Sequence, residues 1–342
     1  MSDPSLDPRK AGAEGDGSPE ARPQAPPPKP SADAPVRLSV VIPCFNEAGR
    51  IGELLKSLCR QSTPLNWEVL VVDNGSTDST KAVAAGFGDR LPLRIVDAAD
   101  RSGAAHARNR GAHHALGDWI VFCDADDVPG DGWLNAMARA LSDHPVVIPR
   151  FEGQRLNPES PFRPLGQQDG VDSLWYPPFL HHAGGSGIGV WRECHERVGG
   201  FDESLRVCED TDYTVRLQLA GYPVRFASDA TLHIRFPSAG GSFLQARQWA
   251  RANTLIYKRY GQDGEDRGKP DEAHAPWRWY LAGVWRIVRR IPRLRKERVR
   301  AFILWQSGWH LGLLEGAVRN RVPPVSHPPR SEDRERDAPA RQ

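Results

Sequence analysis

A short apolar run, residues 38–43 (LSVVIP), opens the part of the chain in which strand-like and helix-like segments alternate. A continuous apolar stretch of this length is typical of a buried parallel strand. The apolar residues that follow have the i, i+3, i+4, i+7 spacing of one helix face: Ile51, Leu54, Leu55 and Leu58. Further strand-like runs cover residues 67–72, 93–96 and 119–123, with a helix expected over 104–116. This alternation predicts an α/β fold with a mostly parallel sheet flanked by helices.

Polar side chains follow three of the expected strands at the points where those strands end. They lie in residues 44–47 (CFNE), 73–74 (DN) and 124–127 (DADD). In open parallel sheets, ligands bind beyond the carboxyl ends of the strands. We therefore expect these carboxylates and amides to gather at one edge of the sheet and to form the binding site.

Asp124, Asp126 and Asp127 place three carboxylates within four residues. Such carboxylates repel one another unless a cation or a set of hydrogen-bond donors neutralises them. Oxygen ligands without a nearby His or Cys favour a hard divalent ion, Mg²⁺ or Mn²⁺, which keeps open positions for phosphate oxygens. The alternative is a solvated acidic turn that caps the next helix.

Several other classes of protein are disfavoured. The first strand is not followed by GxGxxG, and GxxxxGK[ST] is absent, which argues against a dinucleotide dehydrogenase and a P-loop NTPase. Phosphate charge would then be met by the metal and by basic residues such as Arg101 or Arg108. A net charge of +2 does not indicate a nucleic-acid binder. Five cysteines without a CxxC pair, and an N-terminus without an apolar signal segment, favour a cytoplasmic location.

A second acidic cluster, residues 208–212 (CEDTD), opens an expected amphipathic helix that Gly221 ends. Acids in a first helical turn are often simple partners of the helix dipole. The preceding loop, residues 199–203 (GGFDE), favours a pocket wall instead. His233 follows a strand expected over residues 223–227 and is a candidate metal ligand, with a structural role as the alternative.

Six motifs thus occur in order between about Leu38 and His233. They are residues 39–47 (SVVIPCFNE), 68–78 (EVLVVDNGSTD), 107–112 (ARNRGA), 117–127 (GDWIVFCDADD), 199–203 (GGFDE) and 209–212 (EDTD). Together they resemble family 2 glycosyltransferases. The resemblance implies the GT-A fold and an inverting, metal-dependent transfer of a sugar from a nucleotide-diphosphate sugar to an acceptor hydroxyl. Cell-surface polysaccharide or glycolipid synthesis is the setting that it suggests.

The resemblance also implies roles for individual residues. The nucleoside end of the donor pocket would be formed by Pro43, Phe45, Glu47, Asp73 and Asn74. Many relatives carry Asp where this chain has Asn74. The resemblance therefore does not decide which nucleoside the donor carries: uridine, thymidine or guanosine. Asp124 and Asp126 match the DxD motif that holds the ribose and the Mg²⁺ or Mn²⁺ ion, with His233 as a further metal ligand. Asp210 matches the catalytic base of the family's Glu-Asp motif, beside Glu209 in the substrate site.

The chemistry needs these groups. An alcohol is a poor nucleophile, so a carboxylate must take its proton as it attacks the anomeric carbon. A divalent ion stabilises the charge that grows on the leaving nucleoside diphosphate. One displacement, with the base and the leaving group on opposite faces of the sugar, inverts the anomeric configuration.

Two rival functions stay open at this point. Residues 124–128 (DADDV) also fit the DxDx[TV] pattern of haloacid-dehalogenase-like phosphatases, in which the first Asp is the nucleophile. That motif normally follows the first strand of its sheet, whereas here it follows a later one. The other rival is a non-catalytic, membrane-attached scaffold, against which both intact acidic clusters argue.

The C-terminal region differs in composition. Residues 277–321 hold five of the eleven tryptophans, and eight basic residues but one acid lie between Trp285 and Arg300. This composition is typical of an interfacial helix that binds anionic lipid. If the segment binds lipid, a lipid-linked saccharide is a natural acceptor. Nucleic-acid binding is disfavoured, because no recognised nucleic-acid-binding fold accompanies the basic residues. The alternative is a helix pair that packs on the catalytic domain. Pro292 is expected to split the segment, and Gly308, Gly312 and Gly316 allow close helix approach.

The sequence therefore predicts four regions. Residues 1–35 form a disordered Pro-rich tail, 36–262 a GT-A glycosyltransferase domain, 263–321 a basic Trp-rich helical extension, and 322–342 a second disordered tail. We expect a cytoplasmic protein that is peripheral on the inner face of the cell membrane if the extension binds lipid.

Overall fold

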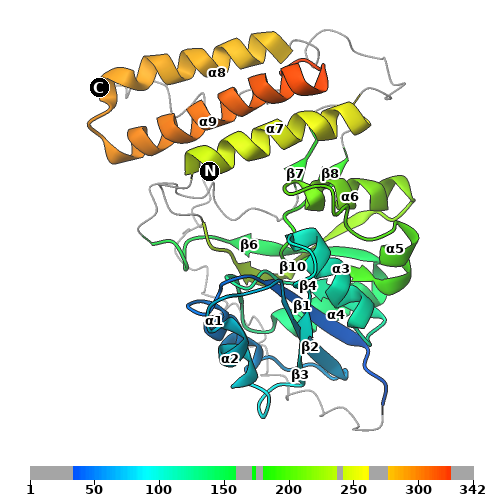
Figure 1. Ribbon diagram of the computed structural model, residues 1–342. Helices are drawn as coiled ribbons and strands as arrows, with labels where there is room; N and C mark the ends of the chain where they lie inside the picture. Colours follow the sequence, from blue (N-terminus) through cyan, green and yellow to red (C-terminus); the bar gives the residue numbers. More distant parts are fainter. Residues whose placement is uncertain (1–33, 159–171, 175–179, 237–241, 262–275, 325–342) are drawn as a thin grey trace, which may run out of the picture.

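The computed structural model describes residues 34–158, 172–174, 180–236, 242–261 and 276–324. The two predicted tails lie outside these residues, apart from 34–35 and 322–324. Strands and helices alternate along the first part of the chain as predicted, and three long helices follow (Figure 1). The fold is therefore the mixed, mostly parallel α/β arrangement with a helical C-terminal region that the sequence indicates.

An eight-stranded sheet forms the centre of the molecule, in the order β3-β2-β1-β4-β9-β6-β10-β5. Its strands are β1 (Leu38–Cys44), β2 (Trp67–Asp73), β3 (Leu93–Asp97), β4 (Trp119–Phe122), β5 (Val128–Pro129), β6 (Val146–Glu152), β9 (Gly189–Trp191) and β10 (Val224–His233). The pairs among β1–β4 are parallel, as is the pair of β6 and β10, whereas β9 and β5 run antiparallel to their neighbours. The short strands β7 (Asp172–Ser173) and β8 (His181–His182) pair separately.

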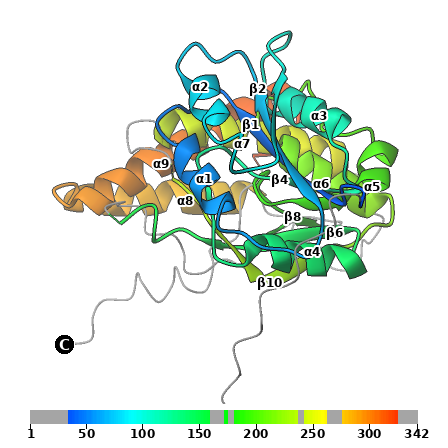
Figure 2. The same cartoon turned by 90° about the horizontal axis from the view of Figure 1, so that it is seen from below.

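Side chains of the central strands alternate between two apolar cores, because successive residues of a strand face opposite sides of a sheet. In β1, Val40 and Ile42 enter one core, whereas Val41 enters the other. The first core is covered by α1 (Ile51–Leu58), α2 (Thr80–Ala85) and α4 (Trp133–Asp143). The second is covered by α3 (Ala104–His114), α5 (Arg192–Arg197) and α6 (Glu209–Leu219), which lie together in Figure 2.

Close packing of α3 on the sheet depends on Gly111. A Cβ atom at this position would lie 2.3 Å from Cγ1 of Val41 and 2.8 Å from Cγ2 of Val72. Only a glycine lets the helix approach β1 and β2 this closely. The approach holds Arg108, one helical turn earlier, beside the carboxyl end of the sheet.

The remaining helices form a layer beyond one end of the sheet: α7 (Ser242–Tyr260), α8 (Pro276–Arg290) and α9 (Glu297–Asn320) (Figure 1). The split at Pro292 is confirmed, since α8 ends at Arg290 and a 3₁₀ turn (Ile291–Arg293) follows. Helix α9 lies between α7 and α8 and contacts both. None of the described helices is long and apolar enough to cross a membrane.

The glycines of α9 allow its backbone to touch that of α7. Cβ atoms at Gly308 and Gly312 would lie 2.2 Å and 2.1 Å from the carbonyl oxygens of Phe243 and Arg247. One at Gly316 would lie 2.3 Å from Oγ1 of Thr254. The extension thus packs on α7, as one of the two sequence interpretations holds, and α7 lies within the predicted 36–262 domain.

Candidate active site at the carboxyl edge of the sheet

The loops after β1 and β2 are tied together by Asn46. This residue adopts a left-handed conformation with φ +57°, which Asn tolerates better than most residues. Its Oδ1 accepts a hydrogen bond of 2.8 Å from the backbone N–H of Thr77, and the backbone N–H of Glu47 donates to Oγ1 of Thr80 at 2.8 Å. The Phe45 ring is left 57% exposed beside this junction, while Pro43 is half-buried in β1. The predicted nucleoside-binding residues of this segment therefore lie beside a junction of two hydrogen-bonded loops.

Asp73 and Asn74 end β2 in different environments. The fully buried Asp73 carboxylate accepts a hydrogen bond of 3.2 Å from the backbone N–H of Ser76. The Asn74 amide donates to the carbonyl oxygens of Ala98 and Arg101 at 2.6 Å and 2.7 Å, and its Oδ1 accepts from the Gly103 N–H at 2.8 Å. A carboxylate has no hydrogen to donate at neutral pH, so an Asp could not make the first two bonds. The bonds give a physical reason for Asn in place of Asp: it shapes the loop over residues 98–103.

Arg108 joins the two acidic clusters. Its guanidinium is 4% exposed and donates to Oδ1 of Asp124 at 2.8 Å and to Oε1 of Glu209 at 2.7 Å. Asp124 follows β4, whereas Glu209 is the first residue of α6. Two clusters that are far apart in sequence are therefore brought to one place at the carboxyl edge of the sheet. Arg101, the other cation suggested for phosphate, binds Glu203 at 2.6 Å instead.

The predicted base, Asp210, is held through both of its carboxylate oxygens. Oδ2 accepts a hydrogen bond from the backbone N–H of Gly185 at 2.8 Å, and Oδ1 accepts from that of Thr211 at 2.7 Å. Burial raises the pKa of this carboxyl, and the nearby Arg108 partly opposes that rise. Cys208, just before α6, has φ +61°, a strained conformation for a residue other than glycine. A fixed orientation and a raised pKa are properties that suit a general base.

The turn after β4 concentrates negative charge. Burial, together with the charges of Asp124 and Glu47, raises the pKa of Asp126 to about 6. Burial also raises the pKa of Asp127, whose Oδ1 accepts a hydrogen bond of 2.9 Å from the Arg235 N–H. Glu47 comes from the loop after β1, so at least one of the residues predicted to bind the donor acts electrostatically on the acidic turn.

His233 lies near this turn but is already paired. It is opposite Val128 in the β10–β5 register, and its Nδ1 is 2.6 Å from Oε2 of Glu152. Across the part of the chain that the structure describes, no three His, Cys, Asp or Glu side chains gather closely enough to hold a metal ion. The oxygen donors of Asp124 and Asp126 nonetheless fit Mg²⁺ or Mn²⁺, because Mg²⁺ is commonly bound by one or two carboxylates plus substrate phosphates.

The loop before β9 supplies site residues that were not among the predicted ones. Gly185 donates its N–H to Asp210, and a Cβ atom there would lie 2.5 Å from Nη2 of Arg108. Ser186 accepts a hydrogen bond at Oγ from the Asp124 N–H at 3.0 Å. The run of residues 184–187 (GGSG) was the available signal, since clustered glycines before a strand often mark a close backbone approach.

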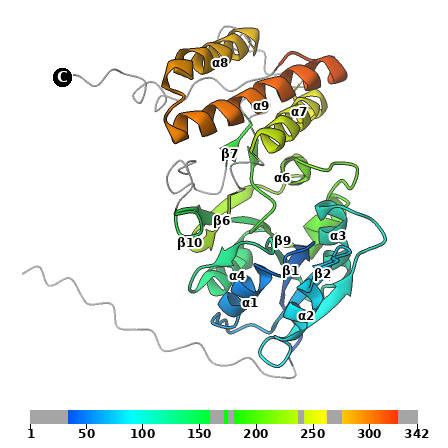
Figure 3. The same cartoon turned by 60° about the vertical axis from the view of Figure 1, so that its left-hand side comes forward.

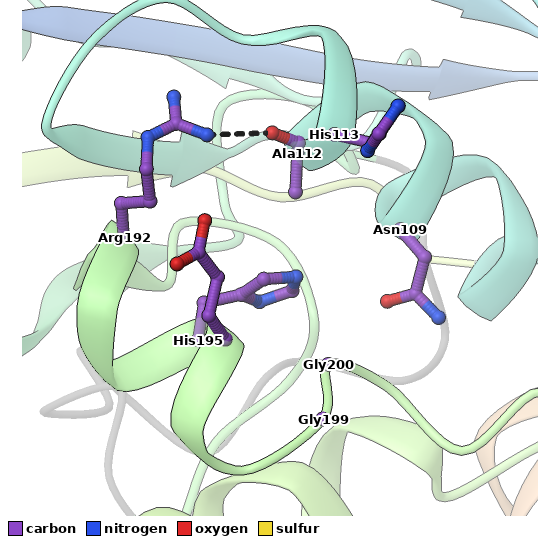
Figure 4. A pocket seen from close by; sticks show the side chains of 8 residues that line it. Asn109, Ala112, His113, Arg192, His195, Gly199 and Gly200 are labelled. Carbon is purple, nitrogen blue, oxygen red and sulfur yellow. Dashed lines mark hydrogen bonds between the residues drawn. The ribbon is translucent and has the colours of Figure 1, made fainter.

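A separate pocket of about 260 Å³ lies between α3 and α5 (Figure 4). Its lining consists of Asn109, Ala112, His113, Arg192, His195, Glu196, Gly199 and Gly200, and includes no residue predicted to bind donor or metal or to act as base. Arg192 donates to the carbonyl oxygens of Ala112 and Ala115, which fixes α5 against the end of α3. Burial lowers the pKa of His195 to about 4, so its ring is neutral at pH 7. This pocket therefore lies among structural contacts.

Comparison with known proteins agrees with this geometry. Residues 39–195 match the family model described as glycosyl transferase family 2. The chain is 30% identical over 207 residues to glycosyltransferase AglE of Haloferax volcanii (56% of this chain, 64% of that protein). It is 30% identical over 216 residues to the succinoglycan biosynthesis protein ExoA of Rhizobium meliloti (58% and 63%). The chain thus spans less than two thirds of the length of either relative.

A solved structure shows the same fold. The mannosyltransferase PcManGT of Pyrobaculum calidifontis, in complex with GDP-Man and Mn²⁺, aligns with a TM-score of 0.59 and 21% identity. The alignment covers 84% of this chain and 89% of that one. Such low identity establishes the architecture alone. Through its residues 39–195, the chain is similar in sequence to glycosyl transferase family 2.

Proposed function

We propose that this protein transfers a sugar from a nucleotide-diphosphate sugar to an acceptor hydroxyl with inversion of the anomeric centre. The observation that carries the proposal is the Arg108 bridge between Asp124 and Glu209, which brings the DxD turn and the Glu-Asp motif to one edge of the sheet. The nucleoside would lie against the loops of Phe45, Glu47 and Asn74. The match of residues 39–195 to the family model and this geometry favour transfer over the phosphatase and scaffold alternatives.

Asp210 is the proposed base. The Gly185 and Thr211 N–H groups fix its carboxylate, and its raised pKa increases its tendency to take the proton of the attacking hydroxyl. Arg108 holds Asp124 and Glu209 in place beside it. Binding and orientation by these fixed groups convert an encounter between two substrates into a reaction within one complex.

Asp126 and Asp124 are the proposed metal ligands, with His233 as a further candidate. A bound Mg²⁺ or Mn²⁺ would act as a Lewis acid on the leaving diphosphate. Burial and the neighbouring carboxylates of Asp124 and Glu47 together raise the pKa of Asp126, and this concentration of negative charge is the feature of the chain that suits such an ion.

The proposed acceptor belongs to a cell-surface polysaccharide or glycolipid, with a lipid-linked saccharide as one candidate. The name of the relative ExoA, a succinoglycan biosynthesis protein, supports a polysaccharide setting. All five cysteines are free, which supports a location in the reducing cytoplasm.

Asp210→Asn tests the proposal. A screen of nucleotide sugars with Mn²⁺ by thermal shift first identifies the donor, because a ligand of the native state raises its stability. With that donor, the variant should lose transfer and nucleoside-diphosphate release by about a thousandfold or more while its donor affinity changes little. The matched control is Asp143→Asn, an exposed acid at the end of α4, which should keep full activity. Full turnover by Asp210→Asn, or release of inorganic phosphate instead of nucleoside diphosphate, would contradict it.

A further inference from the structure

Helix α8 is the outermost element of the helical layer, on the far side of α9 from α7 (Figure 3). Its inner face packs tightly on α9 at Gly283, where a Cβ atom would lie 2.0 Å from Nε2 of His310. The hydroxyl of Tyr280 also donates to the carbonyl oxygen of His310, at 3.3 Å. These contacts fix the rotation of α8 about its own axis and so decide which side chains point outward.

The outward face of α8 is apolar. Trp277, Leu281, Trp285 and Val288 have exposed fractions of 53%, 61%, 59% and 45%. Their i, i+4, i+8, i+11 spacing places them on one side of the helix, roughly opposite Gly283. Beyond the end of the helix, Ile291 and Leu294 are also exposed. We name the surface of these six residues the outer stripe. A continuous exposed apolar strip of this kind marks an interaction site.

Positive charge surrounds the outer stripe. Exposed cations beside or just beyond it are Arg278, Arg289, Arg293, Arg295 and Lys296. Glu297 is the only acid between residues 277 and 300. The pattern of an apolar strip, tryptophan and flanking arginines is that of a helix lying in a lipid–water interface. A second copy of this chain would bring the same cations against themselves, which disfavours self-association through this face.

We propose that the outer stripe binds the surface of an anionic lipid bilayer. The side chains of Trp277, Leu281, Trp285 and Val288 would enter the boundary between headgroups and acyl chains, where tryptophan is favoured. The flanking arginines would contact lipid phosphates, each contributing through the negative surface potential of the membrane. This surface is independent of the proposed catalytic groups and would hold the enzyme where lipid-linked acceptors occur.

Vesicle sedimentation of the full chain tests the proposal. The vesicles contain phosphatidylcholine alone or mixed with phosphatidylglycerol. Wild-type protein should bind the mixed vesicles and lose binding at high salt, because salt screens the charges. The apolar variant Leu281→Ser/Trp285→Ser should bind them about tenfold more weakly or worse. The charge variant Arg289→Glu/Arg293→Glu should bind them about a thousandfold more weakly, because the two substitutions together change the charge by four units at about 1 kcal/mol each.

The control is Leu116→Ser/Ile95→Ser, which removes side chains that are 63% and 39% exposed on the catalytic part of the chain. This variant should bind vesicles like wild type. Equal binding by the apolar variant, or binding that ignores phosphatidylglycerol, would overturn the proposal. A dimer in wild type that the apolar variant loses would also overturn it, since a second copy would then cover the stripe. In the absence of vesicles, the donor should raise the Tm of the apolar and charge variants as much as it raises that of wild type. A loss of vesicle binding with an unchanged donor response then reports on lipid binding alone and not on the proposed transfer.

Discussion

A single buried guanidinium holds the candidate site together. Arg108 reaches Asp124, 16 positions later in the chain, and Glu209, 101 positions later. Both bonds are charge-assisted, and because the Arg108 guanidinium is buried, loss of its carboxylate partners would leave an unpaired buried charge. The same contact that stabilises the fold at this point therefore also sets the distance between the two acidic motifs.

Arg108→Lys should damage both stability and activity. One ammonium lacks the planar fork that donates to two carboxylates at once. We expect a loss of about 3 kcal/mol in the free energy of unfolding, measured in urea, and a large fall in kcat. Arg101→Lys is the control, because that side chain is 65% exposed and should lose under about 1 kcal/mol. Equal effects of the two substitutions would refute the special role of Arg108.

His195 should make stability depend on pH. Its ring is buried beside the Tyr213 hydroxyl at 2.8 Å, and burial lowers its pKa from 6.5 to about 4. Between these two pH values, His195 binds a proton in the unfolded chain but not in the folded chain. The free energy of unfolding therefore falls as the pH drops from 6.5 towards 4. At pH 5 this effect amounts to about 2 kcal/mol.

The check is urea unfolding at neutral pH and at pH 5, in wild type and in His195→Gln. The variant loses the hydrogen bond to Tyr213 at both pH values, so only the difference between them is informative. That difference should shrink by about 2 kcal/mol relative to wild type. An unchanged pH dependence in the variant would mean that His195 is not the group responsible.

At the scale of elements, local patterns in the sequence predicted β1 to β4, the first part of β10 and the helices α1, α3 and α6, but not β5, β6 or β9. The continuous apolar run of β1 reflects burial on both faces of the sheet, and the spacing of Ile51, Leu54 and Leu58 reflects burial of one helix face. The strand predicted over 223–227 continues to His233, past a register irregularity between Ala227 and Thr231. Such an irregularity depends on the partner strand β6, so no local periodicity in the sequence records it.

The glycine contact between α9 and α7 gives a prediction at this scale. Gly312→Ala should gain about 1 kcal/mol in helix propensity. It should lose up to about 3 kcal/mol because the new methyl would lie 2.1 Å from the Arg247 carbonyl oxygen and force the helices apart. We therefore expect a net loss of about 2 kcal/mol, seen as a lower Tm. Gly49→Ala, where the added atom meets nothing within 4 Å, should change stability by less than about 0.5 kcal/mol.

At the scale of the whole molecule, the sequence predicted which strand ends carry the polar residues of the candidate site, but not the contacts that join them. Asp124 and Asp210 stand out as acids after a strand and at a helix start. The Gly185 N–H that holds Asp210 comes from a loop whose position depends on the antiparallel strand β9. Because nearly every residue has a backbone N–H, this donor cannot be identified from the residue type in the sequence. The outward direction of Trp285 depends in turn on Gly283 meeting His310 of another helix.

The buried Asp212 carboxylate helps to fasten the helical layer to α6, the helix that carries the proposed base. Asp212 of α6 is fully buried and accepts hydrogen bonds from Arg259 at 2.8 Å and Tyr260 at 2.6 Å, both at the end of α7, and from Arg216 at 2.7 Å. Asp212 lies two residues after the proposed base, so α7 supports the helix that carries Asp210.

A consequence follows for protein engineering. A chain truncated before α7 would lack Arg259 and Tyr260, two of the hydrogen-bond donors to the buried Asp212. A chain truncated after α7 would expose the backbone of α7 that α9 covers. We expect neither deletion to yield a well-folded minimal enzyme, so the proposed lipid binding is best tested apart from the proposed catalysis by point substitutions on the outward face of α8. Fusion partners and immobilisation tags belong at the chain ends, where they leave this fastening intact.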